Sequence, residues 1–378
     1  MSQISVPCVV YRGGTSRGLF FHKRDLPNDE GLRNQIFLYG IGSHDESQIN
    51  GLGGGTSHTS KVVVIAPSDR EGVDVDYTFY QLSMGEEVVD DRGTCGNLMG
   101  AAGAFAIDEN LVQINESAFS IVTLYNTNTD SIIKVKVPLE DGVAKAHGDY
   151  EVPGLVEPGA RIEIDILDPS SGVTDSILPL GPTNEMKGEE GTIEFTFTDA
   201  VNPVVYVKSE SVGLSGTVST DELKSDPNII STLNNIRDQA TVQTGIAKDM
   251  DEARNVYPAV PKIACVSEPQ DYVTTSGKLV KKEEVDILAK MISMSRVHRT
   301  FAGSGLMNLA ASVLLEGTIP NKVTNVPSSA TEIRIGHPDG VAVIRCSLKD
   351  NQQDVESVGY DRTARRLIKG ELFVPKKK

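Results

Sequence analysis

Residues 91–106, which read DRGTCGNLMGAAGAFA, place one cysteine between a glycine turn and a run of small, helix-prone residues. This order predicts that Cys95 lies at the N-terminus of a helix. Free backbone N–H groups and the helix dipole favour negative charge there, and thiols at such positions tend to ionise. Most cysteines are small buried hydrophobes. Because the turn should expose this thiol, we interpret Cys95 as functional, with Thr94 beside it as a candidate binding residue.

The second half of the chain contains a shorter version of this pattern. Residues 95–102, CGNLMGAA, resemble residues 304–311, SGLMNLAA, so in both a small nucleophilic side chain precedes a glycine and a small-residue helix. The repeat predicts two pseudo-symmetric halves, each presenting a helix N-terminus to a shared cleft that suits carboxylates. Gly303, Ser304 and Gly305 are therefore candidate substrate-binding residues of the second half.

Basic residues flank this second stretch and follow it. His298 stands between Arg296 and Arg299, and residues 361–366 contain three further arginines. Such charges can neutralise a substrate carboxylate, or they can complement a helix dipole or form surface ion pairs. We include His298 among the candidate binding residues and expect that one arginine of residues 361–366 could reach the cleft.

A glycine-rich turn, residues 12–18 (RGGTSRG), lies between strands expected at residues 4–11 and 19–21. Thr15, Ser16 and Arg17 would supply two hydroxyls and a guanidinium, which binds carboxylates through paired hydrogen bonds. The alternative is a plain hairpin turn, which does not need this composition. We therefore take these three residues as candidate substrate contacts.

A third glycine-rich stretch, residues 51–61 (GLGGGTSHTSK), runs into an apolar strand expected at residues 62–66. Ser60 and Lys61 stand at the start of that strand, where glycines and hydroxyls favour a cradle for an anion. A lysine can accept a proton where an apolar wall or other cations disfavour its charge. A solvated lysine is the alternative, and the pattern alone does not decide between the two.

Motifs of common cofactor and metal sites are missing. No G-x-x-x-x-G-K-[ST] occurs, no G-x-G-x-x-G opens a helix, and no G-x-S-x-G elbow joins a strand to a helix, which argues against nucleotide enzymes and serine hydrolases. Cys8, Cys95, Cys265 and Cys346 are far apart and form no metal-binding spacing, so we expect free thiols and no metal.

Composition excludes further partners. A net charge of −16 argues against a nucleic acid or a membrane surface as a partner, since either would need a positive face on the protein. There is no signal-peptide pattern, and no apolar stretch approaches the roughly 18 residues of a membrane span. We therefore expect a cytoplasmic protein that binds a small molecule.

Short strands dominate the rest of the chain, and the regular strand–helix alternation of a doubly wound sheet is missing. The pattern therefore predicts an α+β protein. Turn residues at 181–184 suggest two domains, residues 1–182 and 183–378, with the last strands able to return to the first half. Apart from the helix after Cys95, helices are expected at residues 29–40, 220–224, 228–247, 283–294 and 305–315.

Taken together, the motifs resemble the 2-methylaconitate cis–trans isomerase family, which includes 3-methylitaconate isomerase and 4-oxalomesaconate tautomerase. The resemblance implies a diaminopimelate-epimerase-like fold, in which two similar halves each wrap a β-barrel-like sheet around a central helix. It also implies an active site in the cleft between the halves, no cofactor, and a homodimer or homotetramer. The matching segments, which span nearly the whole chain, are residues 12–18, 59–61, 93–97, 201–204 and 333–338.

The resemblance also implies residue roles. Lys61 and Cys95 match the family's catalytic lysine and cysteine. Arg17 departs from the pattern, because many members carry lysine there, and Ser304 stands where two-cysteine epimerases of this fold carry their second thiol. The positions that match contacts to the substrate carboxylates are Thr15, Ser16, Ser60, Gly96 and Asn97.

The implied reaction moves a proton across three carbons of a small unsaturated di- or tricarboxylate such as methylaconitate, aconitate, methylitaconate or oxalomesaconate. The double bond then shifts or changes between cis and trans. Two alternatives stay open: an epimerase or racemase on the same fold, which the missing second cysteine disfavours, and a non-catalytic accessory protein of an aconitase-like enzyme.

Overall fold

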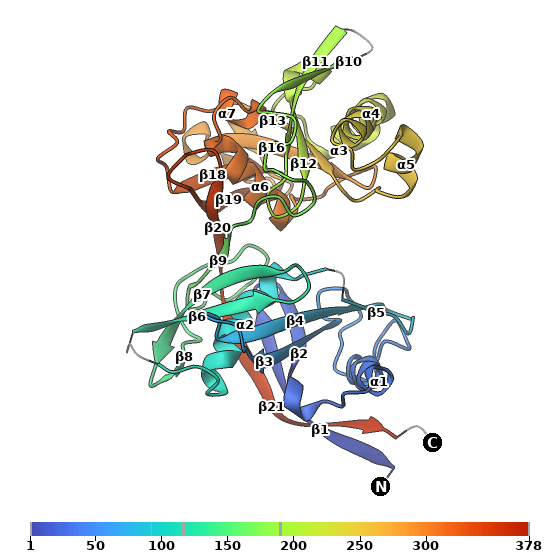
Figure 1. Cartoon of the computed structure of the whole chain (residues 1–378), viewed down its shortest axis with the longest axis vertical. Coiled ribbons are helices and arrows are strands. Elements are labelled where there is room, and N and C mark those ends of the chain that lie inside the picture. Colours follow the sequence, from blue (N-terminus) through green and yellow to red (C-terminus); the bar gives the residue numbers. More distant parts are fainter. Residues whose placement is uncertain (1, 92, 115–117, 189–190, 377–378) are drawn as a thin grey trace. The chain divides into compact units, whose positions relative to one another are not determined.

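The computed structural model describes residues 2–91, 93–114, 118–188 and 191–376 (Figure 1). The chain forms two compact units: the first contains Met1–Leu167 and Tyr360–Lys378, and the second contains Asp168–Gly359. The boundary expected from turn residues followed residue 182, so residues 168–182 fall in the second unit. No helix in the described part of the chain is long and apolar enough to cross a membrane.

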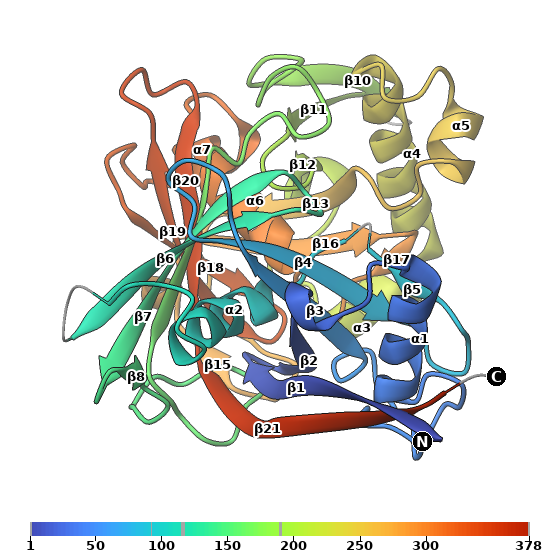
Figure 2. The same ribbon diagram turned by 60° about the horizontal axis from the view of Figure 1, so that its bottom comes forward.

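The first unit is built on one sheet in which the neighbouring strands follow the order β21-β1-β2-β3-β4-β6-β7-β9. The pairs β2–β3 and β4–β6 are parallel, and the other neighbours are antiparallel. Figure 2 shows β21 running beside β1, with which it pairs along its length. The strands are β1 (Gln3–Gly13), β2 (Ser16–His22), β3 (Lys61–Pro67), β4 (Val75–Leu82), β6 (Phe119–Asn126), β7 (Ser131–Glu140), β9 (Ile162–Leu167) and β21 (Ala364–Pro375).

The second unit repeats this order of strand directions. Its neighbouring strands are β11-β12-β13-β16-β18-β19-β20, which correspond to β1-β2-β3-β4-β6-β7-β9 of the first unit. The pairs β12–β13 and β16–β18 are parallel, like β2–β3 and β4–β6, and the others are antiparallel. The expected pseudo-symmetric halves are therefore confirmed. The strands are β11 (Gly191–Thr198), β12 (Val204–Lys208), β13 (Lys262–Ser267), β16 (Ile287–Ser293), β18 (Glu332–His337), β19 (Gly340–Leu348) and β20 (Val355–Arg362).

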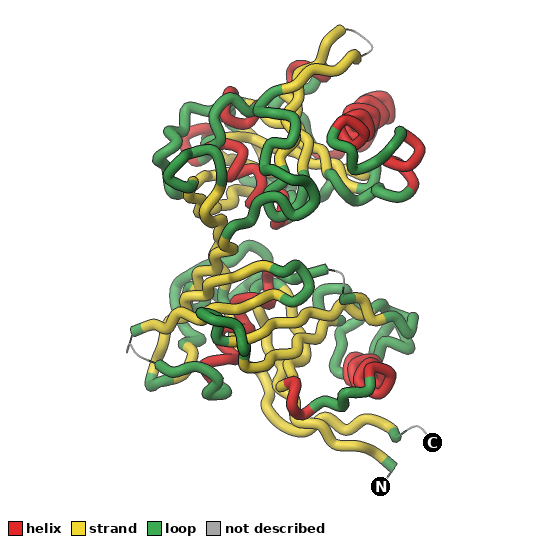
Figure 3. Tube along the Cα trace, viewed as in Figure 1, coloured by secondary structure: helices red, strands yellow, loops and turns green. Residues whose placement is uncertain are grey.

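Strands predominate over helices, as Figure 3 shows, and the expected α+β class is confirmed. The helix expected at residues 283–294 is wrong, because Ile287–Ser293 forms strand β16 between β13 and β18. The apolar residues of β16 are buried on both faces. A run of this kind shows no hydrophobic period that would distinguish a central strand from a buried helix.

The other α-helices are α1 (Glu30–Ile41), α3 (Thr220–Ser225), α4 (Pro227–Gln243), α5 (Met250–Asn255) and α7 (Ile319–Lys322). Short strands complete the fold: β5 (Val89–Asp90), β8 (Val143–Ala144), β10 (Asn184–Gly188), β14 (Tyr272–Val273), β15 (Leu279–Val280) and β17 (Arg296–Val297).

Each unit encloses a helix made of small residues. In the first unit this is α2 (Gly96–Asp108), in which every residue from Leu98 to Ile107 is buried and which contacts strands of the sheet along its length. In the second it is α6 (Gly303–Leu314), buried from Gly305 to Leu314. Small side chains let the backbone of a central helix lie close to the surrounding strands, which explains the repeated glycines and alanines.

Gly103 marks a close approach of α2 to strand β7. A Cβ added there would lie 2.6 Å from Val135 Cγ1 and 2.9 Å from Val135 Cβ on β7. The Gly103→Ala substitution gains about 1 kcal/mol in helix propensity, but overpacking typically costs about 1–3 kcal/mol. We expect net destabilisation of about 1 kcal/mol by denaturant unfolding. Gly370→Ala is the matched control, since nothing lies within 4 Å of a Cβ added there, and equal effects at both positions would contradict the packing argument.

The two faces of the first sheet have different roles. Leu19, Phe21, Val62 and Val64 belong to the core shared with α1. Residues that alternate with them face α2, as the 5.6 Å separation of the Phe20 and Phe105 rings shows. Successive side chains of a strand point to opposite faces, so the register of β2, β3 and β4 decides which candidate residues can meet.

Candidate active site

Cys95 is the N-cap residue of α2, as the sequence predicted. Its Sγ lies 3.9 Å from Ser16 Oγ, and its carbonyl oxygen accepts a hydrogen bond of 3.4 Å from the Tyr77 hydroxyl. The thiol is only 9% exposed, so the expectation that the turn would expose it is wrong. Its sulfur faces the Ser16 hydroxyl of β2 instead. Burial raises the pKa of Tyr77 and also of Tyr360, so both phenols around this helix end remain neutral.

The N-termini of the two central helices differ from those of the other α-helices. A side chain caps α1, α3, α4, α5 and α7 by accepting a hydrogen bond from a first-turn N–H. Neither Cys95 at α2 nor Ala302 at α6 makes such a bond. Among the described residues, no side chain therefore occupies the first-turn backbone donors of these two helices, which lie at the positive end of the helix dipole and can bind an anion.

Asn97 organises the hydroxyls in front of α2. Its Oδ1 accepts a hydrogen bond of 2.8 Å from Arg362 Nε, and because arginine only donates, Asn97 Nδ2 must face the other way. That amide donates to Thr15 Oγ1 at 3.1 Å and to Ser16 Oγ at 3.3 Å. Within the part of the chain that the structure describes, neither hydroxyl donates to an acceptor. Their O–H groups are therefore available to a ligand carboxylate.

Lys61 opens strand β3, and its side chain is largely buried, at 9% exposure. Its Nζ donates a hydrogen bond of 2.5 Å to Gln81 Oε1 and lies 5.1 Å from the centre of the Phe79 ring. The Gln81 amide nitrogen is held in turn by the carbonyl oxygens of Ser57 and Ser60, which fixes its oxygen toward the lysine. Among the described residues no carboxylate forms an ion pair with Lys61, so its charge is not held by an opposite one.

Lys61 and Cys95 lie on the same side of the sheet. Lys61 is directly opposite Gln81 in the β3–β4 register, so both share the face of Tyr77 and Phe79 on β4. The Tyr77 hydroxyl bonds to the backbone of Cys95, while Lys61 lies over Phe79. These two aromatic residues are two positions apart, a repeat of roughly 7 Å along a strand. The amine and the thiol therefore flank one patch of the α2-facing surface.

Three of the residues predicted to contact the substrate do not offer a free group beside Thr15 and Ser16. Arg17 follows Ser16 on β2 and so points to the other face, where its Nη2 donates to the Leu52 carbonyl at 3.1 Å. The Ser60 hydroxyl is already used, because it donates to the Thr56 carbonyl and accepts from Gln48. Thr94 is exposed and accepts a hydrogen bond of 2.8 Å from Asn126 Nδ2.

The remaining candidates, His298, Gly303, Ser304 and Gly305, form a group in the second unit. His298 Nδ1 accepts a hydrogen bond from the Thr300 backbone at 3.3 Å, and burial lowers the pKa of this imidazole. Ser304 lies in the first turn of α6, and Gly305 follows it with no room for a side chain beside Met291. Burial also lowers the pKa of Lys262, which opens β13 as Lys61 opens β3.

Several residues of these groups were missed by sequence reasoning. Gln81 and Tyr77 lie on a strand far from any motif, and only the β3–β4 register brings them to the site. Lys262 has no glycine-rich surroundings, and the strand order that equates it with Lys61 is a property of the fold. Of the arginines at residues 361–366, Arg362 donates a hydrogen bond to Asn97, and whether one of them reaches a cleft stays a prediction.

The other thiols differ from Cys95 in their environment. Cys8, Cys265 and Cys346 are free and buried, and burial raises the pKa of each to about 12, so they stay protonated. Across residues 2–376, apart from the undescribed gaps, no cluster of three or more His, Cys, Asp or Glu could hold a metal ion.

Comparison with known proteins agrees with this architecture. The PrpF protein family matches residues 3–375. The chain is 36% identical over 378 residues to the 3-methylitaconate isomerase of Eubacterium barkeri, with 100% of this chain and 99% of that protein covered. It is 33% identical over 390 positions to the 2-methyl-aconitate isomerase of Shewanella oneidensis, with 99% and 98% covered. The crystal structure of methylitaconate-delta-isomerase superposes with a TM-score of 0.94 at 35% identity, covering 99% of this chain and 97% of that one. The chain therefore belongs to the PrpF protein family.

Proposed function

We propose that this protein is an isomerase that moves a proton within the allylic system of a small unsaturated di- or tricarboxylate, without a cofactor. The observation that carries the proposal is the placement of Lys61 and Cys95 on one face of the first unit, beside the uncapped start of α2. Relatives named as isomerases of methylitaconate and methylaconitate support the choice of substrate class.

Substrate binding follows from the free donors of this face. The O–H groups of Thr15 and Ser16 and the first N–H groups of α2 can all donate to one carboxylate. Charge-assisted hydrogen bonds of this kind are the strong ones, and a helix N-terminus adds its dipole. A carboxylate held there would leave the carbon chain of the acid over the patch between Lys61 and Cys95.

Lys61 acts as the main base in this proposal. Its neutral amine takes a proton from the carbon γ to a carboxylate or keto group, and the electron pair of that C–H bond enters the conjugated system. The product of this step is a dienolate and a lysine ammonium. The hydrogen bond to Gln81 orients the amine of Lys61. No carboxylate among the described residues pairs with this amine, so it can exchange its proton with the substrate.

Cys95 completes the reaction as the acid. Its thiol delivers a proton to the α carbon, which moves the double bond and leaves a thiolate at the helix N-terminus, a place that favours it. If the lysine returns its proton to the γ carbon after bond rotation, the result is cis–trans isomerisation. In both cases the negative charge of the dienolate faces the first turn of α2, an effect typically worth about 3–4 kcal/mol for each donor.

Gln81 gives a test of how the base is positioned. Gln81→Leu removes the hydrogen bond to Lys61 Nζ without adding charge, and we expect a roughly tenfold lower kcat with little change in KM, because the amine loses its aim. Gln81→Glu keeps an acceptor at the same place but adds a negative charge that stabilises the ammonium, so its kcat should fall by more than that of Gln81→Leu. Equal turnover of the two variants and the unmodified protein would argue against a positioning role of Gln81.

The proposed function is tested by incubating the protein in deuterated water with methylaconitate, aconitate, methylitaconate and oxalomesaconate, each followed by proton NMR. We expect deuterium uptake together with double-bond movement or cis–trans change in one of these acids. Lys61→Met serves as the inactive control. Exchange at a stereogenic α carbon alone would indicate an epimerase instead, and no exchange in any acid would contradict an isomerase of this substrate class.

A further inference from the structure

An arginine-lined cavity lies in the first unit, beside the outer strand β21. It has a volume of about 270 Å³ and lies between the paired strands β1 and β21 and the segment 146–158, which connects β8 to β9. Arg12 lines it from β1. The preceding residue, Tyr11, faces α2, because its ring lies 6.1 Å from that of Phe105, so Arg12 points to the opposite face of the sheet. The Arg12 side chain is therefore directed away from the candidate active site.

Two guanidinium groups share this cavity. Arg12 is directly opposite Arg365 in the β1–β21 register, so both side chains extend from the same face, and both line the cavity. On the other side of β1, Arg12 is directly opposite Arg17 of β2, which makes a row of three arginines across neighbouring strands. Like charges in such positions destabilise a sheet, and burial together with the charge of Arg365 lowers the pKa of Arg12. An anion between Arg12 and Arg365 would relieve this repulsion.

One exposed carboxylate is the only acidic group that lines the cavity. Within the described residues Arg12 forms no ion pair, and Arg365 pairs with Glu157 alone, whose Oε2 lies 3.7 Å from its Nη1. That distance is too long for a hydrogen bond, and the Glu157 side chain is 80% exposed, so it lies at the rim of the cavity. The cavity therefore keeps a positive charge in a protein whose net charge is −16.

The two guanidinium groups have donors to spare. Arg12 Nη1 donates to the carbonyl and the hydroxyl of Thr363, both at 2.9 Å, and to the Gly14 carbonyl at 3.1 Å, which holds this side chain in place. Its Nε and Nη2 donate to no acceptor in the part of the chain that the structure describes, and neither does any side-chain nitrogen of Arg365. Arg12 is thus a fixed fork with unused N–H groups, and Arg365 can turn to meet a ligand.

We propose that this cavity binds a small oxyanion, a phosphate or a carboxylate, between Arg12 and Arg365. Guanidinium groups bind both kinds of anion through paired, charge-assisted hydrogen bonds. His147 also lines the cavity and can add a further donor. The volume suits a ligand of a few heavy atoms. This proposal is independent of the proposed isomerase reaction, which assigns no step to these residues.

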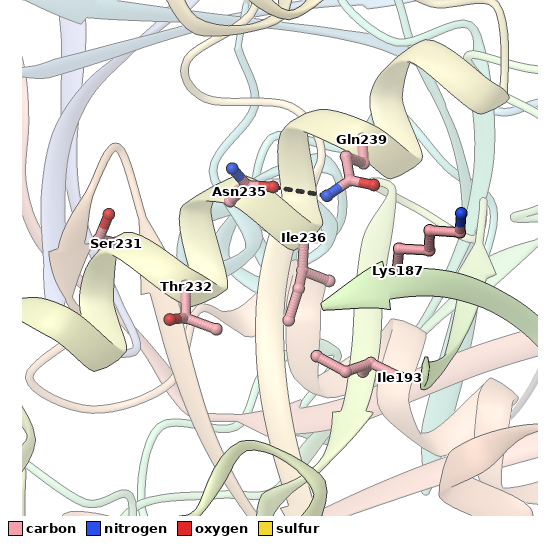
Figure 4. Close-up of a pocket in the computed structure, with 7 residues that line it drawn as sticks. All are labelled: Lys187, Ile193, Ser231, Thr232, Asn235, Ile236 and Gln239. Atoms are coloured by element: carbon pink, nitrogen blue, oxygen red, sulfur yellow. Dashed lines mark hydrogen bonds between the residues drawn. The ribbon is translucent and has the colours of Figure 1, made fainter. Parts of the chain in front are cut away.

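Figure 4 shows a contrasting cavity of about 260 Å³ in the second unit, between α4 and the β10–β11 hairpin. Its lining is made of apolar side chains, hydroxyls and two amides, and Asn235 and Gln239 bond to each other at 2.5 Å. Its one cation, Lys187, is exposed to solvent. This cavity lacks a pair of like charges and carries no comparable argument.

Isothermal titration calorimetry with inorganic phosphate and with acetate, each at pH 7, tests the site. We expect phosphate to bind more tightly, because its larger charge offsets both guanidinium groups, and the preferred anion identifies the ligand class. Arg365→Met should weaken binding by roughly tenfold or more, and Arg12→Met by at least as much. Arg70→Met is the matched control, because Arg70 is 45% exposed, against 47% for Arg365, but is paired with Asp76 at 2.9 Å.

Glu157→Gln should change the affinity in the opposite direction. The Glu157 carboxylate competes with a bound anion for Arg365, so its removal should tighten binding by roughly threefold. Weaker binding in this variant would mean that the glutamate does not compete with the anion for Arg365, which contradicts the proposed position of the ligand.

The outcomes are distinguishable from anion binding at the active site. Binding that survives Ser16→Ala and is lost in Arg365→Met supports the proposal, whereas loss in Ser16→Ala would place the anion at the start of α2 and overturn it. Unchanged affinity in Arg365→Met, or no saturable binding of either anion to the unmodified protein, would also overturn it. Should Arg12→Met fail to fold, judged by circular dichroism, Arg365→Met and Glu157→Gln decide in the same way, because neither of these side chains forms a hydrogen bond within the described part of the chain.

Discussion

Replacing Lys61 by methionine should lower kcat for the isomerised acid by roughly 10³-fold, equivalent to about 4 kcal/mol of transition-state stabilisation. Methionine has a similar length but no proton-accepting group, so it leaves the pocket filled while removing the base. KM should change little, because the proposed carboxylate contacts come from Thr15, Ser16 and the start of α2. The measurement is steady-state kinetics on the acid identified by the NMR panel.

Lys61→Arg tests whether Lys61 accepts a proton or acts only through its positive charge. An arginine stays protonated, so it would preserve any electrostatic attraction of the substrate but could not accept a proton. We expect the arginine variant to be as slow as the methionine variant. If it keeps more than about a tenth of the activity, Lys61 serves as a charge, and the base must be sought elsewhere.

Replacing Cys95 by alanine should stop the double-bond shift while sparing the first proton transfer. The net reaction should slow by roughly 10²-fold or more, because no acid delivers a proton to the α carbon. Lys61 would still remove and return the γ proton, so deuterium should appear at that carbon in unreacted acid. Proton NMR in deuterated water reports both events in one sample.

Cys346→Ala is the matched control for this variant. Cys346 is 2% exposed on β19, and burial raises the pKa of its thiol to about 12, so its loss should leave turnover unchanged. Full turnover of Cys95→Ala would remove this thiol from the chemistry. Equal loss of exchange and of isomerisation would instead assign both proton transfers to Cys95.

Sequence reasoning predicted the helix after Cys95 and the strands around it because both have a local cause. Glycine turns and the period of apolar residues are visible within a few positions. The helix expected at residues 283–294 failed for lack of such a period, since β16 is buried on both faces. Strand order, which pairs β2 with β3 and β12 with β13, depends on contacts between distant residues and could not be read from the chain.

The candidate active site, too, could be predicted from the sequence only in part. Alternation along β2 could have indicated that Ser16 and Arg17 point to opposite faces, because a strand sends successive side chains to opposite sides. Gln81 could not have been found in this way. It is a single amide in an ordinary strand, and only its register opposite Lys61 makes it a partner of the amine.

The return of β21 to the first unit bears on the order in which the protein can fold during synthesis. Strand β1 pairs along its length with residues 364–375, which leave the ribosome after the whole second unit. The second unit, by contrast, is one continuous segment, and all its residues have emerged once Gly359 has been made. Domains of most chains fold from the N-terminus onward. Here the first unit, which contains Lys61 and Cys95, must wait with an unpaired edge on β1, so the proposed active site is completed last.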